Sequence, residues 1–239
     1  MATRRNPTSS HAIFADRSAA GRRLAAALHH YREPPPVVLA VPRGGVPVGY
    51  EIAKALGVSL DLLFVRKLRA PEGPEFGLGA VADCADQQCF LDQEFIDRWH
   101  VEADYIDSEI RVQSEILAAW KRRLLGDRLP LALTDRTVIL VDEGIVTGST
   151  IRAALMALDQ AGVGRKVLAV PVAPQSLLPA LASTVDELVC LRGVSDGQPL
   201  GFYYADFPLT TDDEVVELLR KAGSPVSGAV PGRAFRPAT

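Results

Sequence analysis

Residues 138–150 read VILVDEGIVTGST, an aliphatic run that ends in two acids and continues into a turn of small and hydroxyl-bearing residues. The four consecutive aliphatic residues, Val138 to Val141, are typical of a strand buried on both faces, as in parallel sheets covered by helices. In such open sheets, ligands bind in the crevice at the carboxyl ends of the strands. Asp142 and Glu143 are therefore expected at that edge, where they can meet a ligand.

The turn after the two acids is predicted to bind a phosphate group. Thr147, Gly148, Ser149 and Thr150 precede a stretch with apolar residues at helical spacing, which ends at Gly162. Hydroxyls, unpaired N–H groups and the helix dipole all favour an anion at a helix N-terminus. The stretch has neither the lysine of a P-loop nor the G-x-G-x-x-G of a dinucleotide site. The plain alternative is an ordinary turn in which a hydroxyl caps the helix.

The 138–150 segment resembles the ribose-phosphate-binding motif of type I phosphoribosyltransferases, which use phosphoribosyl pyrophosphate (PRPP). Their motif is an apolar strand, two acids, two or three variable residues and then Thr-Gly-x-Thr. Other stretches resemble a bacterial group within that superfamily: Phe14–Arg17 (FADR) with Ala20-Gly21, Val41–Pro47 (VPRGGVP), Val65–Lys67 (VRK), Pro74–Val81 (PEFGLGAV) and Tyr204–Phe207 (YADF). The resemblance extends over residues 13–222.

The resemblance implies an α/β fold, a doubly wound and mostly parallel sheet flanked by helices, with a small hood. We expect one domain over residues 13–222 with a helical insertion at about 93–125, a flexible N-terminus over 1–12 and a disordered tail over 223–239. Residue patterns predict strands at 37–41, 60–65, 166–172 and 187–191, a hairpin from 76–81 and 89–91, and helices at 16–30, 46–56, 175–182 and 212–221. The 93–125 insertion is predicted to hold two helices that join near His100.

Two further segments are predicted to bind pyrophosphate. The glycines of the loop 42–45 (PRGG) allow a backbone to approach a ligand closely, and a guanidinium suits pyrophosphate oxygens. By resemblance, Arg43, Gly44 and Gly45 bind the pyrophosphate of PRPP in a loop that often contains a non-proline cis peptide. Lys67, the second of two cationic residues after an apolar run, is expected to act on the same group as a point charge. A tight turn with a solvated arginine and a solvated surface pair are the alternatives.

Residues 68–75 (LRAPEGPE) contain two prolines and a glycine. Such a segment is expected to form either a lid that excludes water during transfer or a rigid hairpin loop. The sequence does not decide between the lid and the hairpin loop.

The reaction that the resemblance implies is displacement of pyrophosphate from C1 of PRPP by an acceptor, commonly a nucleobase nitrogen. Asp142, Glu143, Lys67 and Arg43 are the expected catalytic residues. The two acids hold the ribose hydroxyls, the turn 147–150 anchors the 5′-phosphate, and the cations stabilise the leaving group together with Mg²⁺. Mg²⁺ is expected to arrive mainly with PRPP, and no metal site formed by the protein alone is predicted.

Two positions depart from the family pattern. Glu143 stands where most relatives in the group carry a second aspartate, so its oxygens are shifted by about one C–C bond length. Val146 stands where 6-oxopurine enzymes carry an aspartate that interacts with purine N7, so hypoxanthine and guanine lose support as acceptors. The acceptor stays open, with the 93–125 helices and the 201–207 segment as candidate recognition elements; there, Tyr203 or Tyr204 either stacks on a base or packs in the core.

An alternative from another functional class is a sensor that binds PRPP or a nucleotide and performs no transfer. A sugar-phosphate hydrolase needs a positioned general base, and no histidine lies near any of the motifs in the sequence. Release of pyrophosphate would distinguish a transferase from a sensor.

Composition limits the partners and the compartment. The 239 residues carry 26 basic and 29 acidic side chains, a net charge of −3, which gives no electrostatic footprint for nucleic acid. Cys84, Cys89 and Cys190 form neither an even disulfide framework nor a metal-binding pair, which favours a reduced, cytoplasmic protein. We expect no signal peptide and no membrane span. Homodimers are common in the superfamily, so a homodimer is left open.

Overall fold

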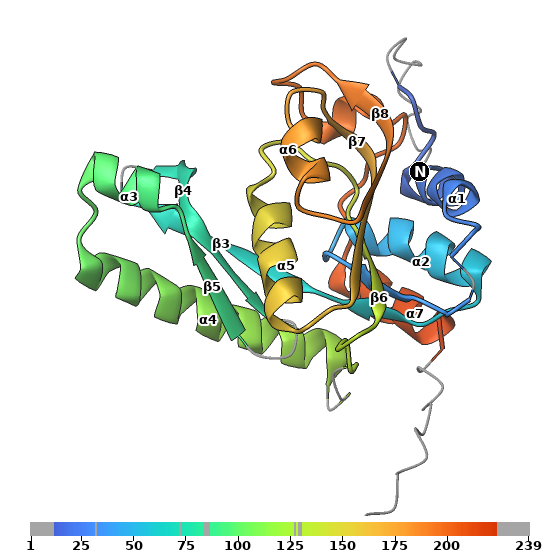
Figure 1. Ribbon diagram of the computed structural model, residues 1–239, viewed down its shortest axis with the longest axis horizontal. Coiled ribbons are helices and arrows are strands. Elements are labelled where there is room, and N and C mark those ends of the chain that lie inside the picture. Colours follow the sequence, from blue (N-terminus) through green and yellow to red (C-terminus); the bar gives the residue numbers. More distant parts are fainter. Residues whose placement is uncertain are drawn as a thin grey trace, which may run out of the picture.

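Five parallel strands form the central sheet of the computed structural model, which describes residues 12–31, 33–71, 73–83, 87–126, 128 and 131–223 (Figure 1). Their spatial order is β2-β1-β6-β7-β8. In register, Ala40 of β1 lies beside both Leu62 of β2 and Val141 of β6, so these strands end at one edge. The strands are β1 (Val37–Ala40), β2 (Leu60–Leu62), β6 (Thr137–Val141), β7 (Arg165–Pro174) and β8 (Glu187–Val194).

Helices cover both faces of this sheet, as the predicted doubly wound fold requires. Residues of α1 (Arg17–Ala27), α2 (Gly45–Leu56) and α7 (Asp212–Lys221) pack in one hydrophobic cluster with one face of the strands. Residues of α5 (Ser149–Gln160) and α6 (Leu178–Ala182) pack in a second cluster with the opposite face. The run Val138 to Val141 is continuous because alternate side chains enter the two clusters, and all four are buried.

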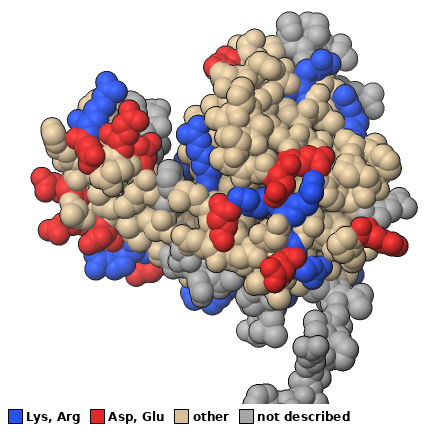
Figure 2. Space-filling model, in the orientation of Figure 1, with Lys and Arg blue, Asp and Glu red and all other residues tan. Residues whose placement is uncertain are grey.

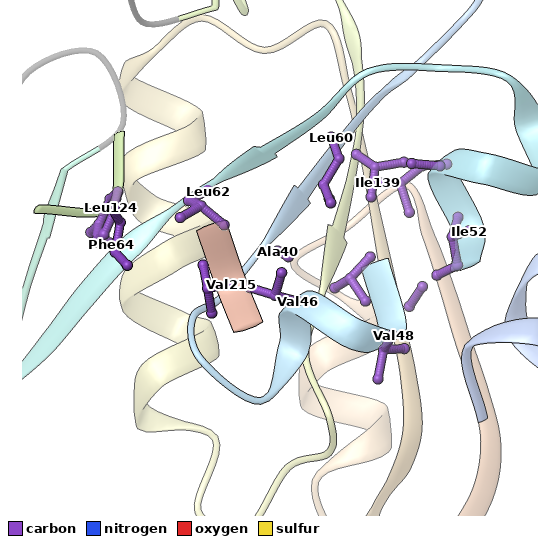
Figure 3. Close-up of a cluster of buried hydrophobic side chains, with 14 of the residues drawn as sticks. Ala40, Val46, Val48, Ile52, Leu60, Leu62, Phe64, Leu124, Ile139 and Val215 are labelled. Carbon is purple, nitrogen blue, oxygen red and sulfur yellow. The ribbon is translucent and has the colours of Figure 1, made fainter. Parts of the chain in front are cut away.

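The core beneath α2 shows how the sheet and helices fit together. Ala40, Leu60 and Ile139 come from three adjacent strands, and Val46 and Ile52 come from α2 (Figure 3). All five side chains are fully buried. α2 ends where Gly57 adopts a left-handed conformation at φ 69°, which glycine tolerates without steric cost.

A second sheet and two helices form an arm that extends from the body (Figure 1). The strands are antiparallel in the order β3-β4-β5, with β3 (Phe64–Ala70), β4 (Gly73–Asp83) and β5 (Gln87–Leu91). The helices are α3 (Gln93–Trp99) and α4 (Ala103–Leu125), separated at His100, which has a left-handed conformation. The prediction of two helices that join near His100 is therefore confirmed. Phe64, Leu68, Leu117 and Leu124 belong to the same cluster as α2.

The predicted strand at 60–65 is wrong in its extent. The apolar run LDLLFV is shared by two strands, since β2 ends at Leu62 in the parallel sheet and β3 begins at Phe64 in the arm. The predicted hairpin is confirmed between β4 and β5, but β3 adds a third strand that the sequence reading did not include. Residues 68–70 belong to β3 and β4 begins at Gly73, so the 68–75 segment is largely the β3–β4 hairpin.

The remaining predicted elements are found with small changes at their ends. A 3₁₀ helix, η1 (Leu200–Tyr203), lies between β8 and α7. Residues 1–11 and 224–239 lie outside the described residues, so the expected flexible N-terminus and disordered tail stay predictions. No helix among the described residues is both long and apolar enough to cross a membrane.

Candidate active site

Two loops meet at the carboxyl ends of β1 and β6. The chain runs from β1 through α2 to β2 on one side and from β6 through α5 to β7 on the other, so the strand order reverses between β1 and β6. Such a switch point is where open α/β sheets bind ligands. The loop after β1 holds residues 42–44, and the loop after β6 holds Asp142 to Gly148.

Glycines bring these two loops into direct contact. A Cβ on Gly45 would lie 2.9 Å from the Val141 carbonyl oxygen, and one on Gly44 would lie 2.0 Å from Cδ of Glu143. No side chain larger than hydrogen fits at Gly44 while Glu143 keeps its place. The peptide bond between Pro42 and Arg43 is cis, the feature that the resemblance implied for this loop.

A cleft of about 180 Å³ lies over the loop after β6. Six of the predicted site residues line it: Lys67, Asp142, Glu143, Thr147, Gly148 and Thr150. Its other lining residues are Gly144, Ile145, Val146, Ile151 and Leu200. Cationic, acidic and hydroxyl groups from β3, the loop after β6 and the start of α5 therefore converge on one space.

The turn at the start of α5 has the geometry predicted for it. Gly148 is the N-cap residue and adopts a left-handed conformation at φ 79°. The hydroxyl oxygens of Thr147 and Ser149 lie 3.1 Å apart, and Thr150 faces the cleft. Because α5 is 12 residues long, its N-terminal N–H groups and dipole attract an anion at this turn.

Asp142 has an unusual protonation equilibrium. Burial, followed by the negative charge of neighbouring Glu143, raises the pKa of the Asp142 carboxyl to about 8. The Glu143 N–H donates a hydrogen bond to Asp142 Oδ1 at 2.7 Å, and this bond and the charge of Arg17 oppose the rise in pKa. The raised pKa favours the protonated form of the Asp142 carboxyl at neutral pH.

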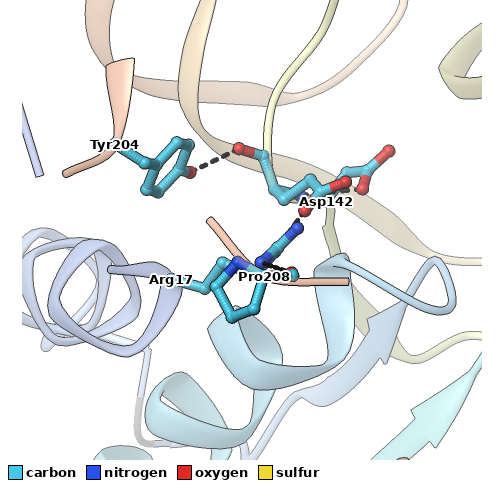
Figure 4. A network of polar contacts seen from close by, with 5 residues as sticks. Arg17, Asp142, Tyr204 and Pro208 are labelled. Atoms are coloured by element: carbon cyan, nitrogen blue, oxygen red, sulfur yellow. Dashed lines mark hydrogen bonds and ion pairs between the residues drawn. The ribbon is translucent and has the colours of Figure 1, made fainter. Parts of the chain in front are cut away.

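Glu143 is fixed by residues from both ends of the chain (Figure 4). Its carboxylate forms an ion pair with Arg17, which also donates to the Pro208 carbonyl oxygen at 2.7 Å. The Tyr204 hydroxyl donates to the Glu143 carbonyl oxygen at 2.5 Å. The Arg17 guanidinium lies 3.7 Å from the ring centroid of Phe207. Glu143 is thus held by its side chain and its backbone together.

Arg17 is a site residue that the sequence did not predict, and the contact of Tyr204 with Glu143 was not predicted either. Both residues lie in stretches that resemble the bacterial group, FADR and YADF, but Arg17 was given no role and Tyr204 was considered only for stacking on a base or packing in the core. The structure joins the two stretches, because Ala205 N–H donates to the Phe14 carbonyl oxygen at 2.9 Å and Asp206 N–H donates to that of Ala15 at 2.8 Å. Tyr203 and Tyr204 are both buried, so packing accounts for them better than stacking on a base.

The structure separates Arg43 from the other predicted residues. Arg43 forms an ion pair with Asp212 of α7, with Nε 3.3 Å from Oδ1, and lines a different cavity beside α4. Arg66 and Lys67 lie on opposite faces of β3, because successive side chains of a strand alternate. Lys67 faces the cleft, whereas Arg66 Nε donates to Gln113 Oε1 of α4 at 2.7 Å.

Comparisons with known proteins agree with this fold. The model of the phosphoribosyl transferase domain family matches residues 11–205. Two Mycobacterium tuberculosis proteins, named "Putative phosphoribosyl transferase Rv0571c" and "Putative phosphoribosyl transferase MT0597", are each 39% identical over 210 residues, or 88% of this chain and 47% of theirs. The chain thus spans about half the length of these curated relatives. The crystal structure of TT1426 from Thermus thermophilus is 37% identical, covers 88% of this chain and 99% of its own, and has a TM-score of 0.75.

Proposed function

Because the chain belongs to the phosphoribosyl transferase domain family, with a type I α/β fold, we propose that it transfers ribose 5-phosphate from PRPP to an acceptor and releases pyrophosphate. The observation that carries this proposal is the single cleft shared by a lysine, two acids and a hydroxyl-bearing helix start. Each of these groups suits one part of PRPP, and all of them lie at the switch point of the sheet.

The 5′-phosphate is assigned to the turn 147–150, where hydroxyls and N–H groups at the start of α5 donate to phosphate oxygens. Lys67, from the arm, approaches the same cleft as a flexible point charge. We assign Lys67 to the pyrophosphate, where it stabilises the negative charge of the leaving group. This places the phosphate and the leaving group at two sides of the cleft, with C1 of the ribose between them.

The two acids take different roles in this proposal. Glu143 is engaged by Arg17 and packs against Gly44, so it fixes the two loops relative to each other. The protonated form of Asp142, which the raised pKa favours at neutral pH, can both donate to and accept from the ribose hydroxyls. Asp142 is therefore the acid that we assign to the 2′ and 3′ hydroxyls, while Glu143 contributes its charge from the side.

Arg43, Gly44 and Gly45 remain assigned to pyrophosphate in the proposal, with the backbone as the main contact. The loop lies beside the cleft and is pressed against Glu143. The Arg43 guanidinium lies against Asp212 instead of the cleft, so it takes part in leaving-group binding only after it breaks that ion pair.

The side chains of the cleft fit Mg²⁺ only if the ion arrives bound to PRPP. Among the described residues, no group of three His, Cys, Asp or Glu side chains is placed to hold a metal. Mg²⁺ commonly binds through substrate phosphates and one or two carboxylates. Asp142 and Glu143 are the acidic side chains at the cleft, and Asp142 would have to release its proton to bind Mg²⁺, which would neutralise charge on the pyrophosphate.

A sensor that binds PRPP without transfer is the second candidate. It is favoured by the position of Arg43, which pairs with Asp212 and is not directed to a leaving group. The acceptor of the transferase stays open, since exposed Val146 offers no acid or base to a purine N7.

Calorimetric titration of PRPP with and without Mg²⁺ tests the pocket. We expect saturable Mg²⁺-dependent binding that Thr150→Val and Asp142→Asn weaken by at least about tenfold, because each removes a direct hydrogen-bonding group. Asp206→Asn, which alters an exposed acid, is the matched control and should leave the affinity unchanged. Absence of binding to well-folded protein would refute the proposed function.

A screen of acceptors for pyrophosphate release then separates the two candidates. Release that depends on an acceptor and is lost in Lys67→Gln establishes a transferase. Tight PRPP binding without release over a broad panel of nucleobases favours the sensor.

A further inference from the structure

A second cavity, of about 350 Å³, lies between α4, α7, β3 and the loop after β1. Among the described residues, its lining is Arg43, Arg66, Ile116, Ala119, Trp120, Arg123 and Asp212, none of which lines the cleft at the switch point. Arg66 and Lys67 mark the division, because neighbouring residues on β3 face the two different spaces. The cavity volume falls in the lower range of small-molecule sites, which span about 300–1,000 Å³.

The cavity carries excess positive charge. Three guanidinium groups line it against one carboxylate, that of Asp212, which leaves two positive charges. Arg66 is partly buried, and burial, followed by the charge of Arg69, lowers its pKa. The negative charge of Glu109, which accepts a hydrogen bond from Gln113, opposes this lowering of the Arg66 pKa.

Asp212 is shared among three donors and binds each at long range. Its oxygens lie 3.3 Å from Arg43 Nε, 3.2 Å from Arg123 Nε and 3.3 Å from the Trp120 indole nitrogen. Charge-assisted hydrogen bonds of full strength are about 2.7–2.9 Å long. Both arginines use Nε for this contact, and a guanidinium has four other N–H donors. An added anion can therefore bind these arginines while they keep Asp212.

One face of α4 supplies an apolar wall, formed by Ile116, Ala119 and Trp120, beside the arginine side chains of the cavity. Ile116, Ala119, Trp120 and Arg123 follow one another at intervals of three, one and three residues, so they lie on one side of the helix. Ile116 is 42% exposed although it is aliphatic. The Trp120 ring meets Phe64 edge-on at 5.5 Å between centroids, and this contact fixes the orientation of the indole. A planar apolar group fits against such a wall.

We propose that this cavity is a second ligand site that binds a nucleoside monophosphate, with the phosphate among Arg43, Arg66 and Arg123 and the base against Trp120 and Ile116. A phosphate monoester carries about two negative charges, which match the two excess positive charges of the cavity. The volume and the single aromatic wall suit one base with one sugar. Arg43 also belongs to the loop whose Gly44 packs on Glu143, so a ligand here acts directly on a loop of the proposed active site.

Tryptophan fluorescence tests this site without PRPP. The chain has two tryptophans, so the conservative Trp99→Phe variant leaves Trp120 as the only indole. Titration of this variant with AMP and with UMP should give a saturable change in emission. Inorganic phosphate, which lacks the base, should bind at least about tenfold more weakly.

Variants locate the binding. Arg123→Gln in the same background should weaken AMP binding by at least about tenfold, since a charge-assisted hydrogen bond is lost. Arg122→Gln is the matched control, because it removes the same charge from the neighbouring exposed position of α4 and should have no effect. Thr150→Val, in the cleft, should also leave the affinity unchanged.

Three outcomes would overturn the proposal: no saturable change with either nucleotide, a loss of binding in Thr150→Val but not in Arg123→Gln, or equal affinities for phosphate and AMP. Because PRPP is absent from the assay and Thr150→Val reports on the cleft, failure of this site is distinguishable from failure of the proposed transferase function.

Discussion

Glu143 illustrates how a single methylene group can redirect a side chain. An aspartate at this position would be one carbon shorter and would draw the carboxylate back from Arg17 and Gly44. The glutamate reaches both, and it ties α1, the loop after β1 and the loop after β6 together. The departure from the two-aspartate pattern of the group is thus explained by the contacts that Glu143 makes with Arg17 and with the loop at Gly44.

Replacement of Arg17 should destabilise the protein strongly. The side chains of Arg17 and Glu143 are only 9% and 21% exposed, so Arg17→Met leaves a poorly solvated carboxylate, at a cost on the order of 3 kcal/mol. Glu143→Gln in the same background should recover part of this loss. Urea denaturation of the single and double variants measures both effects.

Arg22→Met provides the matched control for that series. Arg22 pairs with Glu51 at 3.2 Å, but its side chain is 58% exposed, so its loss should cost less than about 1 kcal/mol. Equal costs at the two arginines would contradict the structural role given to the Arg17 ion pair.

Asp142 makes the stability of the protein depend on pH. Its pKa is raised from 3.8 to about 8 on folding, so between these values the folded state binds a proton that the unfolded state does not. The free energy of unfolding therefore falls as pH rises through this window. Asp142→Asn does not titrate, so the variant should gain stability relative to wild type at pH 8 and not at pH 4.

The size of this effect follows from the linkage relation. One pKa unit corresponds to about 1.4 kcal/mol, so even half of the elevation gives roughly 3 kcal/mol between the two ends of the window. Denaturation curves of both proteins at several pH values provide the test. Asp206→Asn is the control, because it measures the general effect of removing one acidic side chain. A stability difference that stays constant with pH would contradict the elevated pKa.

At the scale of elements, the contact between the two loops depends on the absence of a side chain at Gly44. The backbone of Gly44 has φ −65° and ψ −28°, which alanine adopts freely, so an effect of Gly44→Ala comes from the added Cβ and not from backbone conformation. That Cβ would lie 2.0 Å from Glu143 Cδ and must displace the carboxylate.

Gly44→Ala should therefore weaken PRPP binding by at least about tenfold and destabilise the fold by about 1–3 kcal/mol, the usual cost of overpacking. Glu143→Ala should suppress the destabilisation caused by Gly44→Ala, because it removes the side-chain atoms with which the new Cβ collides. The Gly44→Ala/Glu143→Ala double variant should therefore be no less stable than Glu143→Ala alone. Additive losses in the double variant would show that the clash is not the cause. Urea denaturation and PRPP titration supply the measurements.

Local patterns predicted most elements because their signals lie within a few residues. The run Val138 to Val141, the helix stop at Gly57 and the break at His100 are all found in the structure. The division of residues 60–65 between two sheets was missed, since the apolar run has no turn residue at Leu63 and only the tertiary fold makes the chain leave one sheet there.

Local sequence patterns predict the candidate site less completely than they predict the helices and strands. Asp142, Glu143 and the 147–150 turn are contiguous, so one motif was enough to group them. Arg17 and Glu143 are 126 residues apart, and Tyr204 lies 61 residues beyond Glu143, so no local pattern links them. The direction of Arg43 toward Asp212 likewise depends on the position of α7, which sequence spacing does not specify.

At the scale of the whole molecule, the arm projects from the body, and Figure 2 shows the surface hollowed between them, with acidic and basic side chains interspersed over this face. The arm nevertheless shares a core with the body. Phe64 and Leu117 of the arm belong to the same buried cluster as Val46 of α2 and Val215 of α7. A shared core couples the unfolding of the two parts, because neither can open without exposing the side chains of the other.

We therefore expect one cooperative unfolding transition. A destabilising substitution within the arm should lower the stability of the whole protein. Leu117 is 1% exposed, so Leu117→Ala should lower the free energy of unfolding by about 2–5 kcal/mol, whereas Val112→Ala, at a 46% exposed position of the same helix, should change it by less than about 1 kcal/mol. Both tryptophans lie on α3 and α4, so fluorescence reports on the arm and far-ultraviolet circular dichroism reports on the whole chain. The two signals should shift together in Leu117→Ala. An earlier fluorescence transition would mean that the arm unfolds alone, and Lys67 would then be carried by an element able to leave the cleft without loss of the body.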